Sequence, residues 1–350
     1  MTSERVFAAP GKLLLLGEYA VLEGAPALVT AADRFARVAV EPIAGDYHQL
    51  VARPLESEPR EFRLVDDRLE WRRADGAERL WLVSAVLEAL GPWTQGGGSL
   101  RLSLDTGAFH APDGDKLGLG SSAALTTAVA AAWFGTRNRS RSLDRHRWLP
   151  LLVDLHRRLQ GGRGSGADVA AAVHGGTLRY RAVADAAPEV ELVALPAGLE
   201  FMWIWLGRSA STSDYLARMA DFSTSEPALY RRHAEFLGDL SEQGLAALAE
   251  GNSSRFLEMV DAYGRAMDRL GAAANAPVYT VDHRRLAELA DRAGVAFKPS
   301  GAGGGDIAMA VANDTQALSD LARRVTAAGY QLLEIGPGAP GVGELGGDGG

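Results

Sequence analysis

The spacing of apolar residues predicts strands in the first part of the chain. From Val6 to Val40 the pattern predicts a strand, a glycine turn, an apolar strand over 13–16, a second turn and another strand around 27–29. Short strands at 62–65 and 69–71 predict a surface hairpin in an otherwise charged and irregular stretch. The chain therefore opens with a β-rich region.

Apolar residues first recur at helical spacing over residues 80–90, which predicts a helix that ends before the stop signal Gly91-Pro92. A half-exposed strand is predicted at 100–104. Two alanine-rich helices come next, and each is preceded by a glycine-rich segment. Their predicted bounds are 123–134, after the loop at 118–122, and 169–173, after the loop at 161–168. Ser121 and Ser122 are placed to cap the first of these helices.

Strands at 177–183 and 201–206 flank a natural domain boundary, and helices dominate after it. The predicted helices are 226–249, 253–273 and 281–293, followed by strand 307–311, helix 315–328 and strand 331–335. This order fits a ferredoxin-like second domain. We predict an N-terminal domain over 1–190, a C-terminal domain over 191–342 and, because the end is rich in glycine, a mobile tail over 343–350.

Composition narrows the class of protein. The 350 residues are 47% apolar and 23% charged, which is typical of an ordinary globular protein with one large or two closely packed domains. A net charge of −8 argues against nucleic acid or an anionic membrane as a partner. The absence of cysteine excludes disulfides, thiolate metal sites and a cysteine nucleophile. With no signal-peptide pattern and no apolar run of roughly 20 residues, we expect a cytoplasmic protein without a membrane span.

The segment from Lys116 to Leu125 is the strongest candidate for a binding site. Its glycines allow backbone amides to approach an anion, and the following helix directs its free N–H groups and the positive end of its dipole to the same place. The segment matches neither the Walker loop nor the dinucleotide fingerprint. Taken alone, it indicates a phosphate-binding loop or an ordinary helix cap.

Three segments in a fixed order resemble the signature motifs of the galactokinase, homoserine kinase, mevalonate kinase and phosphomevalonate kinase (GHMP) superfamily. They are Ala9–Val21, Gly118–Ala124 and Lys298–Asp306. The resemblance implies an α/β (α+β) fold of two domains, ribosomal-S5-like and ferredoxin-like, with the active site between them. It also implies a small-molecule kinase that uses ATP and Mg²⁺.

Within the superfamily the chain is most similar to the phosphomevalonate kinases. The run from His156 through Gln160 to Asp168 resembles their helix and second glycine loop, and Tyr19 stands where mevalonate kinases tend to have histidine. Mevalonate kinases also carry a metal-binding glutamate before the loop, and this chain has none there. The implied acceptor is 5-phosphomevalonate. A mevalonate kinase and a non-catalytic ligand sensor of the same fold remain as alternatives.

The resemblance assigns roles to individual residues. Asp168 and Lys12 are the expected catalytic residues, with Asp168 acting as a general base or as an organiser of charge, and Ser122 is the expected Mg²⁺ ligand. The ATP phosphates would be bound by Lys116, Gly118, Leu119, Gly120, Ser121, Ser122 and Ala123. The phosphorylated or carboxylated substrate would be bound by Lys12, Glu18, Tyr19, Ser165, Gly166, Asp168, Ser211, Thr212, Gly301, Ala302 and Gly303. We expect His156 to be a structural residue or to support the site from behind, rather than to bind metal. The oligomeric state stays open, a homodimer included.

Overall fold

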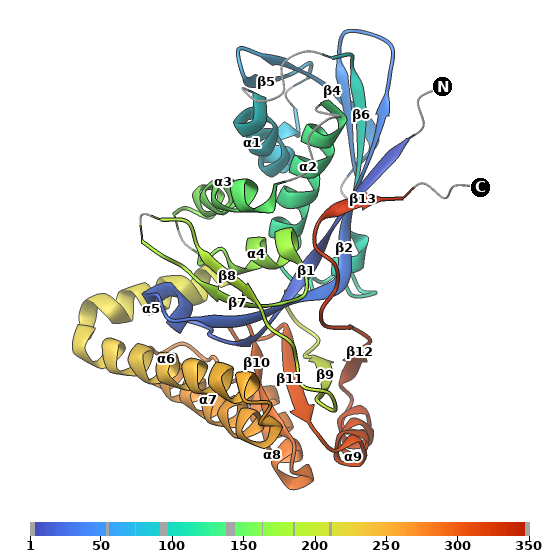
Figure 1. Ribbon diagram of the computed structural model, residues 1–350. Helices are drawn as coiled ribbons and strands as arrows, with labels where there is room; N and C mark the ends of the chain where they lie inside the picture. The colour runs from blue at the N-terminus through green and yellow to red at the C-terminus, as the bar shows by residue number, and fades with distance from the viewer. Residues whose placement is uncertain are drawn as a thin grey trace.

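The computed structural model describes residues 4–53, 56–73, 75–91, 97–137, 144–162, 164–184, 186–209 and 212–346. Two units stand one above the other (Figure 1). The first contains a nine-stranded sheet with helices α1 to α4, and the second contains a four-stranded sheet with helices α5 to α9. This is the two-unit α/β arrangement that the sequence predicted.

The first sheet is organised around its two longest strands, β1 (Arg5–Leu16) and β2 (Ala27–Pro42), which pair antiparallel. The strand order is β13-β1-β2-β6-β3-β4-β5, and β7 joins the other end of β2 and pairs with β8. The remaining strands are β3 (His48–Arg53), β4 (Glu56–Val65), β5 (Arg68–Trp71), β6 (Leu100–Asp105), β7 (Thr177–Arg181), β8 (Glu189–Leu192) and β13 (Gly343–Leu345).

The turn predicted between two short strands at the start of the chain is wrong, because β1 runs without a break through Gly11. Its register shifts between Pro10 and Gly11, which marks a bulge. A Cβ atom at Gly11 would lie 2.7 Å from the carbonyl oxygen of Leu119 and from the ring of Phe109. Glycine at position 11 therefore allows β1 to lie in close contact with the loop before α2.

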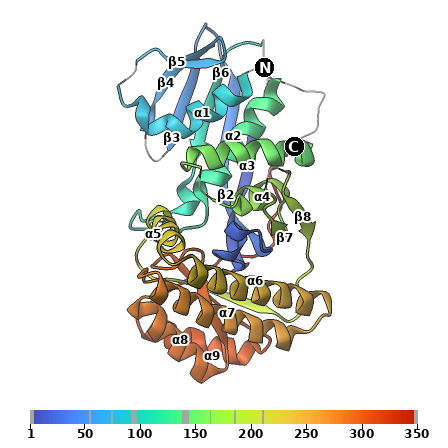
Figure 2. The same cartoon turned by 90° about the vertical axis from the view of Figure 1, so that its left-hand side faces the viewer.

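Four helices cover one face of the first sheet, as Figure 2 shows from the side. They are α1 (Trp81–Leu90), α2 (Ser121–Arg137), α3 (Arg145–Leu159) and α4 (Ala167–His174). The alanine-rich helix α2 is buried from Ala123 to Trp133 at nearly every position and packs against β1, β2, α1 and α4. Small side chains suit such a central helix, because its neighbours approach it from all sides.

The second unit runs in the order β9, α5 to α8, β10, β11, α9 and β12, which is a ferredoxin-like β-α-β-β-α-β order with four helices in the first helical position. Strand β10, which this order requires, was not among the strands predicted from the sequence. The antiparallel sheet of this unit has the order β10-β11-β9-β12. The strands are β9 (Glu200–Trp205), β10 (Ala296–Ser300), β11 (Ile307–Ala312) and β12 (Gln331–Leu333). The helices are α5 (Thr212–Ser225), α6 (Pro227–Ala249), α7 (Ser253–Ala273), α8 (Val281–Ala293) and α9 (Thr315–Ala327).

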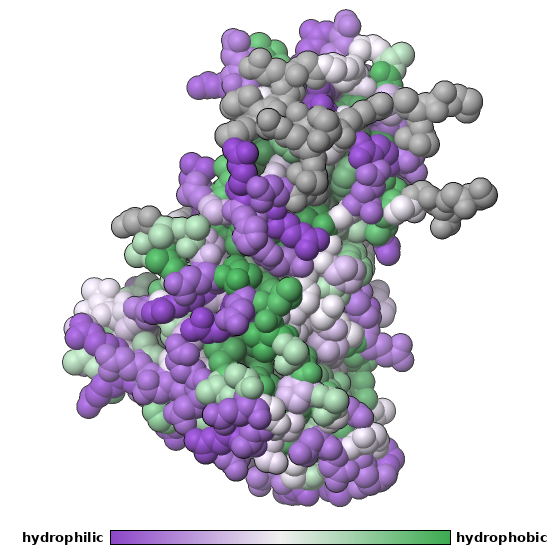
Figure 3. Space-filling model, viewed as in Figure 1, coloured by the Kyte–Doolittle hydropathy of each residue, from purple (hydrophilic) through white to green (hydrophobic). Residues whose placement is uncertain are grey.

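Alternate residues of β9 enter two different cores. Ile204 packs with α8 and α9, whereas Trp203 and Trp205 join the large core that continues into the first unit. The short helix η1 (Ala20–Glu23) and the end of β1 also reach the second unit, where they contact α6 and α7. Apolar residues gather in the middle of the face drawn in Figure 3, between the two units, while the surface of the lower helices is mostly hydrophilic. The units thus share a continuous apolar core.

The mobile tail predicted from residue 343 is wrong for its first residues, because 343–345 form strand β13 beside β1. The Arg5 guanidinium donates to Glu344 at 2.6–2.7 Å, and the Ala339 amide donates to the Ala31 carbonyl at 3.1 Å. Through these contacts the chain after β12 packs against the first unit again. The second domain predicted over 191–342 therefore ends before residue 342. Residues 347–350 lie outside the described residues. Within the described part, no helix is long and apolar enough to span a membrane.

Candidate active site

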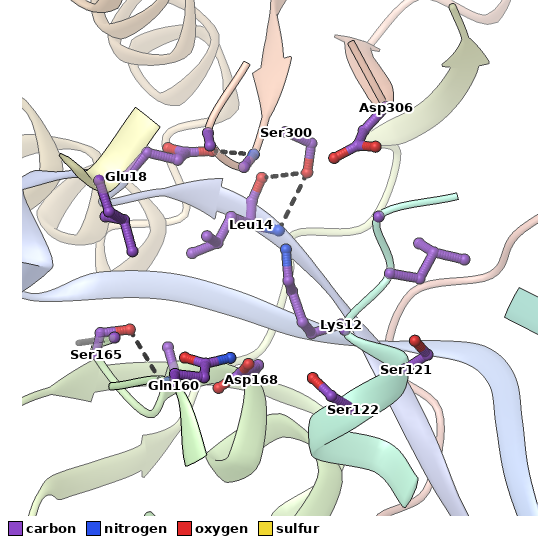
Figure 4. A pocket seen from close by; sticks show the side chains of 18 of the residues that line it. Lys12, Leu14, Glu18, Ser121, Ser122, Gln160, Ser165, Asp168, Ser300 and Asp306 are labelled. Carbon is purple, nitrogen blue, oxygen red and sulfur yellow. Dashed lines mark hydrogen bonds between the residues drawn. The ribbon is translucent and has the colours of Figure 1, made fainter. Parts of the chain in front are cut away.

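A cavity of about 320 Å³ lies where the two units meet. The first unit contributes β1, the loop before α2 and the start of α4, and the second contributes the turn that follows β10. Figure 4 shows the side chains of Lys12, Ser122 and Asp168 around this cavity, each from a different element. Residues that are distant in sequence therefore come together here.

The loop before α2 has the backbone shape that its glycines permit. Gly118 and Gly120 have φ angles of +73° and +75°, which other residues rarely adopt. A Cβ atom at Gly120 would lie 3.1 Å from Cγ of Lys12 and 3.6 Å from Cβ of Asp168. Because α2 begins at Ser121, its first N–H groups have no partner within the helix and are available to an anion in the cavity.

Lys12 connects this loop to the second unit. Its backbone amide donates to the Leu119 carbonyl at 2.8 Å, which ties β1 to the loop. Its ammonium extends towards the second unit, where Nζ would lie 3.6 Å from a Cβ atom at Gly301. The Lys12 ammonium therefore lies close to the glycine turn, while the methylene groups of the same side chain pass the loop before α2.

Asp168 is the second residue of α4, and its Oδ1 accepts a hydrogen bond from the Val169 amide at 2.9 Å. The preceding loop is held from behind: Tyr180 donates to the Ser165 carbonyl at 2.5 Å, and Ser165 Oγ accepts from the Ala167 amide at 3.2 Å. Burial, followed by the nearby Asp168 carboxylate, raises the pKa of Tyr180. Tyr180 therefore stays a neutral donor that fixes the loop.

Glu18 is buried, and its carboxylate faces the second unit. Oε1 accepts from the Lys298 ammonium and from the Gly301 amide at 3.2 Å, while the Lys298 side chain is fully excluded from solvent. Burial lowers the pKa of Lys298, and the charge and hydrogen bond of Glu18 oppose that effect. In the sequence, Lys298 was recognised only as the first residue of a motif. Its role in holding Glu18 depends on tertiary packing.

Tyr19 makes a parallel contact across the two units, because its hydroxyl donates to the Ala302 carbonyl. Its φ angle is +64°, and burial raises the pKa of its hydroxyl. Ser300 adds further contacts, accepting from the Leu14 amide at 3.2 Å and donating to the Leu14 carbonyl at 2.9 Å. The turn after β10 is thus fastened to β1 by several hydrogen bonds.

Asp306 ends that turn and lies against the phosphate-loop candidate. A Cβ atom at Gly118 would lie only 2.4 Å from Cγ of Asp306, so glycine is required at position 118. The Asp306 amide donates to the Arg208 carbonyl at 2.9 Å, which places the residue beside the end of β9. The sequence motif contained Asp306, but no role followed from it.

Most of the predicted site residues line the cavity. They are Lys12, Glu18, Tyr19, Lys116, Gly118, Leu119, Gly120, Ser121, Ser122, Ser165, Asp168, Gly301 and Ala302. Three others do not line it and support the loops from behind: Ala123, Gly166 and Gly303. Ser211 lies outside the described residues, and Thr212 is described only as the backbone that begins α5.

Several lining residues were not predicted. They include Leu14, Gln160, Leu216, Ser300 and Asp306. Leu14, Gln160, Ser300 and Asp306 belong to the segments that carried the family resemblance, which was the available signal. Leu216 has no such signal, because only the packing of α5 brings it to the cavity.

A metal ion at this site would have few protein ligands. Among the described residues, no group of three or more histidine, aspartate or glutamate side chains could bind a metal. Ser122 Oγ and the Asp168 carboxylate are oxygen donors of the kind that Mg²⁺ prefers, and Mg²⁺ commonly takes one or two protein ligands together with substrate phosphates. The residues present therefore fit a Mg²⁺ ion bound mainly through a nucleotide.

The chain is similar in sequence to known proteins. Residues 82–176 match the family model for the GHMP kinases N terminal domain. A phosphomevalonate kinase from Streptomyces sp. (strain CL190) is 29% identical over 95% of this chain and 97% of its own length. The chain therefore has a GHMP kinase N-terminal domain. It is a homologue of phosphomevalonate kinase.

Solved structures show the same fold. A Lin0012 protein from Listeria innocua matches with a TM-score of 0.88 and 22% identity, covering 99% of this chain and all of its own. A Streptococcus pneumoniae phosphomevalonate kinase, solved in complex with phosphomevalonate and AMPPNP, matches with a TM-score of 0.77 and 21% identity, covering 95% of this chain and 99% of its own. The predicted two-domain GHMP kinase fold is confirmed.

Proposed function

We propose that this protein transfers the γ-phosphoryl group of ATP to 5-phosphomevalonate, with Mg²⁺ as the metal, and forms 5-diphosphomevalonate. The observation that supports this most is the convergence of Lys12, Asp168 and the N-terminus of α2 on one cavity. Phosphoryl transfer requires mainly positioning and neutralisation of charge, and these groups supply both.

The loop from Gly118 to Ser122 would bind the phosphates of ATP. Its glycines have positive φ angles and no side chain to obstruct an anion, and the free amides of α2 supply donors together with the positive end of the helix dipole. Lys116 lines the same cavity and would add a cation. The N-terminal family match over 82–176, which includes this loop, and the AMPPNP bound to the Streptococcus relative support ATP as the donor.

Lys12 and Asp168 would act at the transferred group. Lys12 would neutralise charge that develops between donor and acceptor. A phosphate monoester has a second pKa near 6, so its attacking oxygen is largely deprotonated at neutral pH and needs little help from a base. For this acceptor, Asp168 would serve mainly to organise Lys12 and Mg²⁺. Ser122 would be the protein ligand of a Mg²⁺ ion that enters with ATP, and the ion would supply neutralisation of phosphate charge.

The acceptor is tested by coupling ADP release to a spectroscopic assay with four compounds: phosphomevalonate, mevalonate, homoserine and galactose. We expect turnover with phosphomevalonate at least ten-fold above the others. Preference for mevalonate would overturn the proposed acceptor but not the proposed kinase activity. Saturable binding of one compound, without ADP release in the presence of any of the four, would overturn the kinase activity and favour a ligand sensor.

A further inference from the structure

A buried histidine lies directly behind the candidate catalytic groups. His156 is on α3 and is only 2% exposed. Its Nε2 lies 3.1 Å from Ser122 Oγ, and its Nδ1 lies 3.9 Å from Asp168 Oδ2. One imidazole therefore touches the residue expected to bind Mg²⁺ and faces the residue expected to organise charge.

Gln160 indicates which ring nitrogen carries the proton. Its side-chain amide nitrogen lies 3.4 Å from His156 Nε2, and an amide NH₂ group can only donate. Nε2 is then the acceptor, shared between Gln160 and the Ser122 hydroxyl. In a neutral imidazole the proton is consequently on Nδ1, the nitrogen that faces Asp168.

This arrangement orients both partners. If the Ser122 hydroxyl donates its hydrogen to Nε2, the oxygen lone pairs point away from His156 and towards the cavity, where a metal ion or phosphate needs them. The Nδ1–H group faces the Asp168 carboxylate across 3.9 Å, a separation that can shorten when ligands close the site. The Asp168 side chain is 22% exposed, so this contact limits how it can turn towards solvent.

We propose that His156 is a positioning residue for phosphoryl transfer, which fixes the Ser122 hydroxyl through Nε2 and the Asp168 carboxylate through Nδ1. The inference rests on the proposed function, since it assigns His156 to the same reaction. Another buried histidine shows the contrast: the described contacts of His283 are with Thr280 at the start of α8 and with the ring of Tyr279. His156 differs because both of its ring nitrogens face residues that line the cavity.

Three substitutions separate the two contacts. Glutamine places its amide group near the position of Nε2, so His156→Gln keeps an acceptor for Ser122. Asparagine places its amide near Nδ1, so His156→Asn keeps a donor for Asp168. His156→Phe keeps a ring and removes both contacts.

We expect kcat for His156→Phe to fall about 10- to 100-fold. The kcat of each polar variant should be about ten-fold higher than that of His156→Phe, because one hydrogen bond is typically worth about that factor. The control is His174→Phe, because His174 lies at the end of α4 that is opposite to Asp168. This variant should keep the wild-type kcat.

The Ser122→Ala background tests whether the Nε2 contact is the cause. Without the hydroxyl, His156→Gln should lose its advantage over His156→Phe. Equal kcat values for the two variants in the wild-type background would overturn the inference, and so would an advantage that persists in Ser122→Ala. Thermal unfolding of every variant shows which losses come from misfolding.

A second readout does not depend on turnover. The ¹⁵N chemical shifts of the His156 imidazole in the free protein, assigned by their disappearance in His156→Asn, should show a proton on Nδ1 and none on Nε2. Ser122→Ala should shift the Nε2 resonance. A proton on Nε2, or no response to Ser122→Ala, would overturn the positioning role. If no acceptor is phosphorylated, the proposed function fails, and these spectra still decide the orientation of His156.

Discussion

The carboxylate of Glu18 forms a buried ion pair with the ammonium of Lys298, and the two side chains are 2% and 0% exposed. Glu18 follows the end of β1, and Lys298 lies on β10, so the ion pair joins the two units beside the cavity. The Gly301 amide shares Oε1 of Glu18, which ties the glycine turn to the same pair. An interaction so completely buried is sensitive to the loss of either charge.

Glu18→Gln should therefore destabilise the protein. Glutamine has nearly the same shape but leaves the Lys298 charge uncompensated, and breaking a buried ion pair costs about 3–5 kcal/mol. Urea unfolding at pH 7 measures the change. Glu258→Gln is the control, because Glu258 forms an exposed ion pair with Arg255 that is worth less than about 1 kcal/mol. Equal effects from the two substitutions would contradict a structural role for the buried pair.

Asp168→Asn should lose most of kcat and leave ATP binding nearly unchanged. The substitution removes the charge, while the loop and the start of α4 keep their hydrogen bonds to Tyr180 and Ser165. Steady-state kinetics gives kcat, and calorimetry with a non-hydrolysable ATP analogue gives the affinity. A variant with wild-type kcat would remove Asp168 from its assigned role.

Gly120→Ala should weaken nucleotide binding by at least ten-fold. The new Cβ atom would lie 3.1 Å from Lys12 Cγ, in a loop where φ is +75°. Gly251→Ala is a matched control, since Gly251 has a φ of +68° and open space around it at the end of α6. Both substitutions should cost similar backbone strain, about 1 kcal/mol or more. If Gly120→Ala binds the nucleotide as well as Gly251→Ala does, the loop is not the phosphate site.

The residues of this loop also show how far the sequence could predict the site. From local backbone properties alone, glycines at 118 and 120 before an alanine-rich helix indicated an anion site or an ordinary helix cap. The resemblance favoured the anion site and added Lys12 and Asp168. The partner of Glu18 could not be predicted, because Lys298 is 280 positions away and is brought there only by packing. In the same way, strand β13 was missed because a glycine-rich end has a weak strand propensity and is held by contacts with β1 and Arg5.

His283 should make the protein sensitive to acid. Burial, followed by the charge of Arg208, lowers its pKa from 6.5 to about 3. The unfolded chain binds a proton below pH 6.5 and the folded protein does not, so stability is complete above pH 6.5 and falls as the pH drops towards 3. The full effect is on the order of 4–5 kcal/mol.

His283→Gln should flatten this part of the pH profile. Glutamine can replace histidine in the capping box with Thr280 and does not titrate. Chemical unfolding from pH 8 to pH 4 measures the difference between the two proteins, which should shrink or reverse at low pH. Some sensitivity should remain, since burial lowers the pKa of His48 to about 4. Parallel profiles for the wild type and the variant would contradict this account.

The central claim is that a phosphoryl group moves from ATP to a phosphate monoester at the cavity between Lys12, Ser122 and Asp168. The most direct measurement is ³¹P NMR of phosphomevalonate incubated with Mg²⁺, ATP and the enzyme. The account predicts that the monoester singlet is replaced by two coupled doublets of a diphosphate as ADP appears, and that Asp168→Asn nearly abolishes the change. An unchanged monoester singlet, with ATP either intact or hydrolysed to inorganic phosphate, would contradict it.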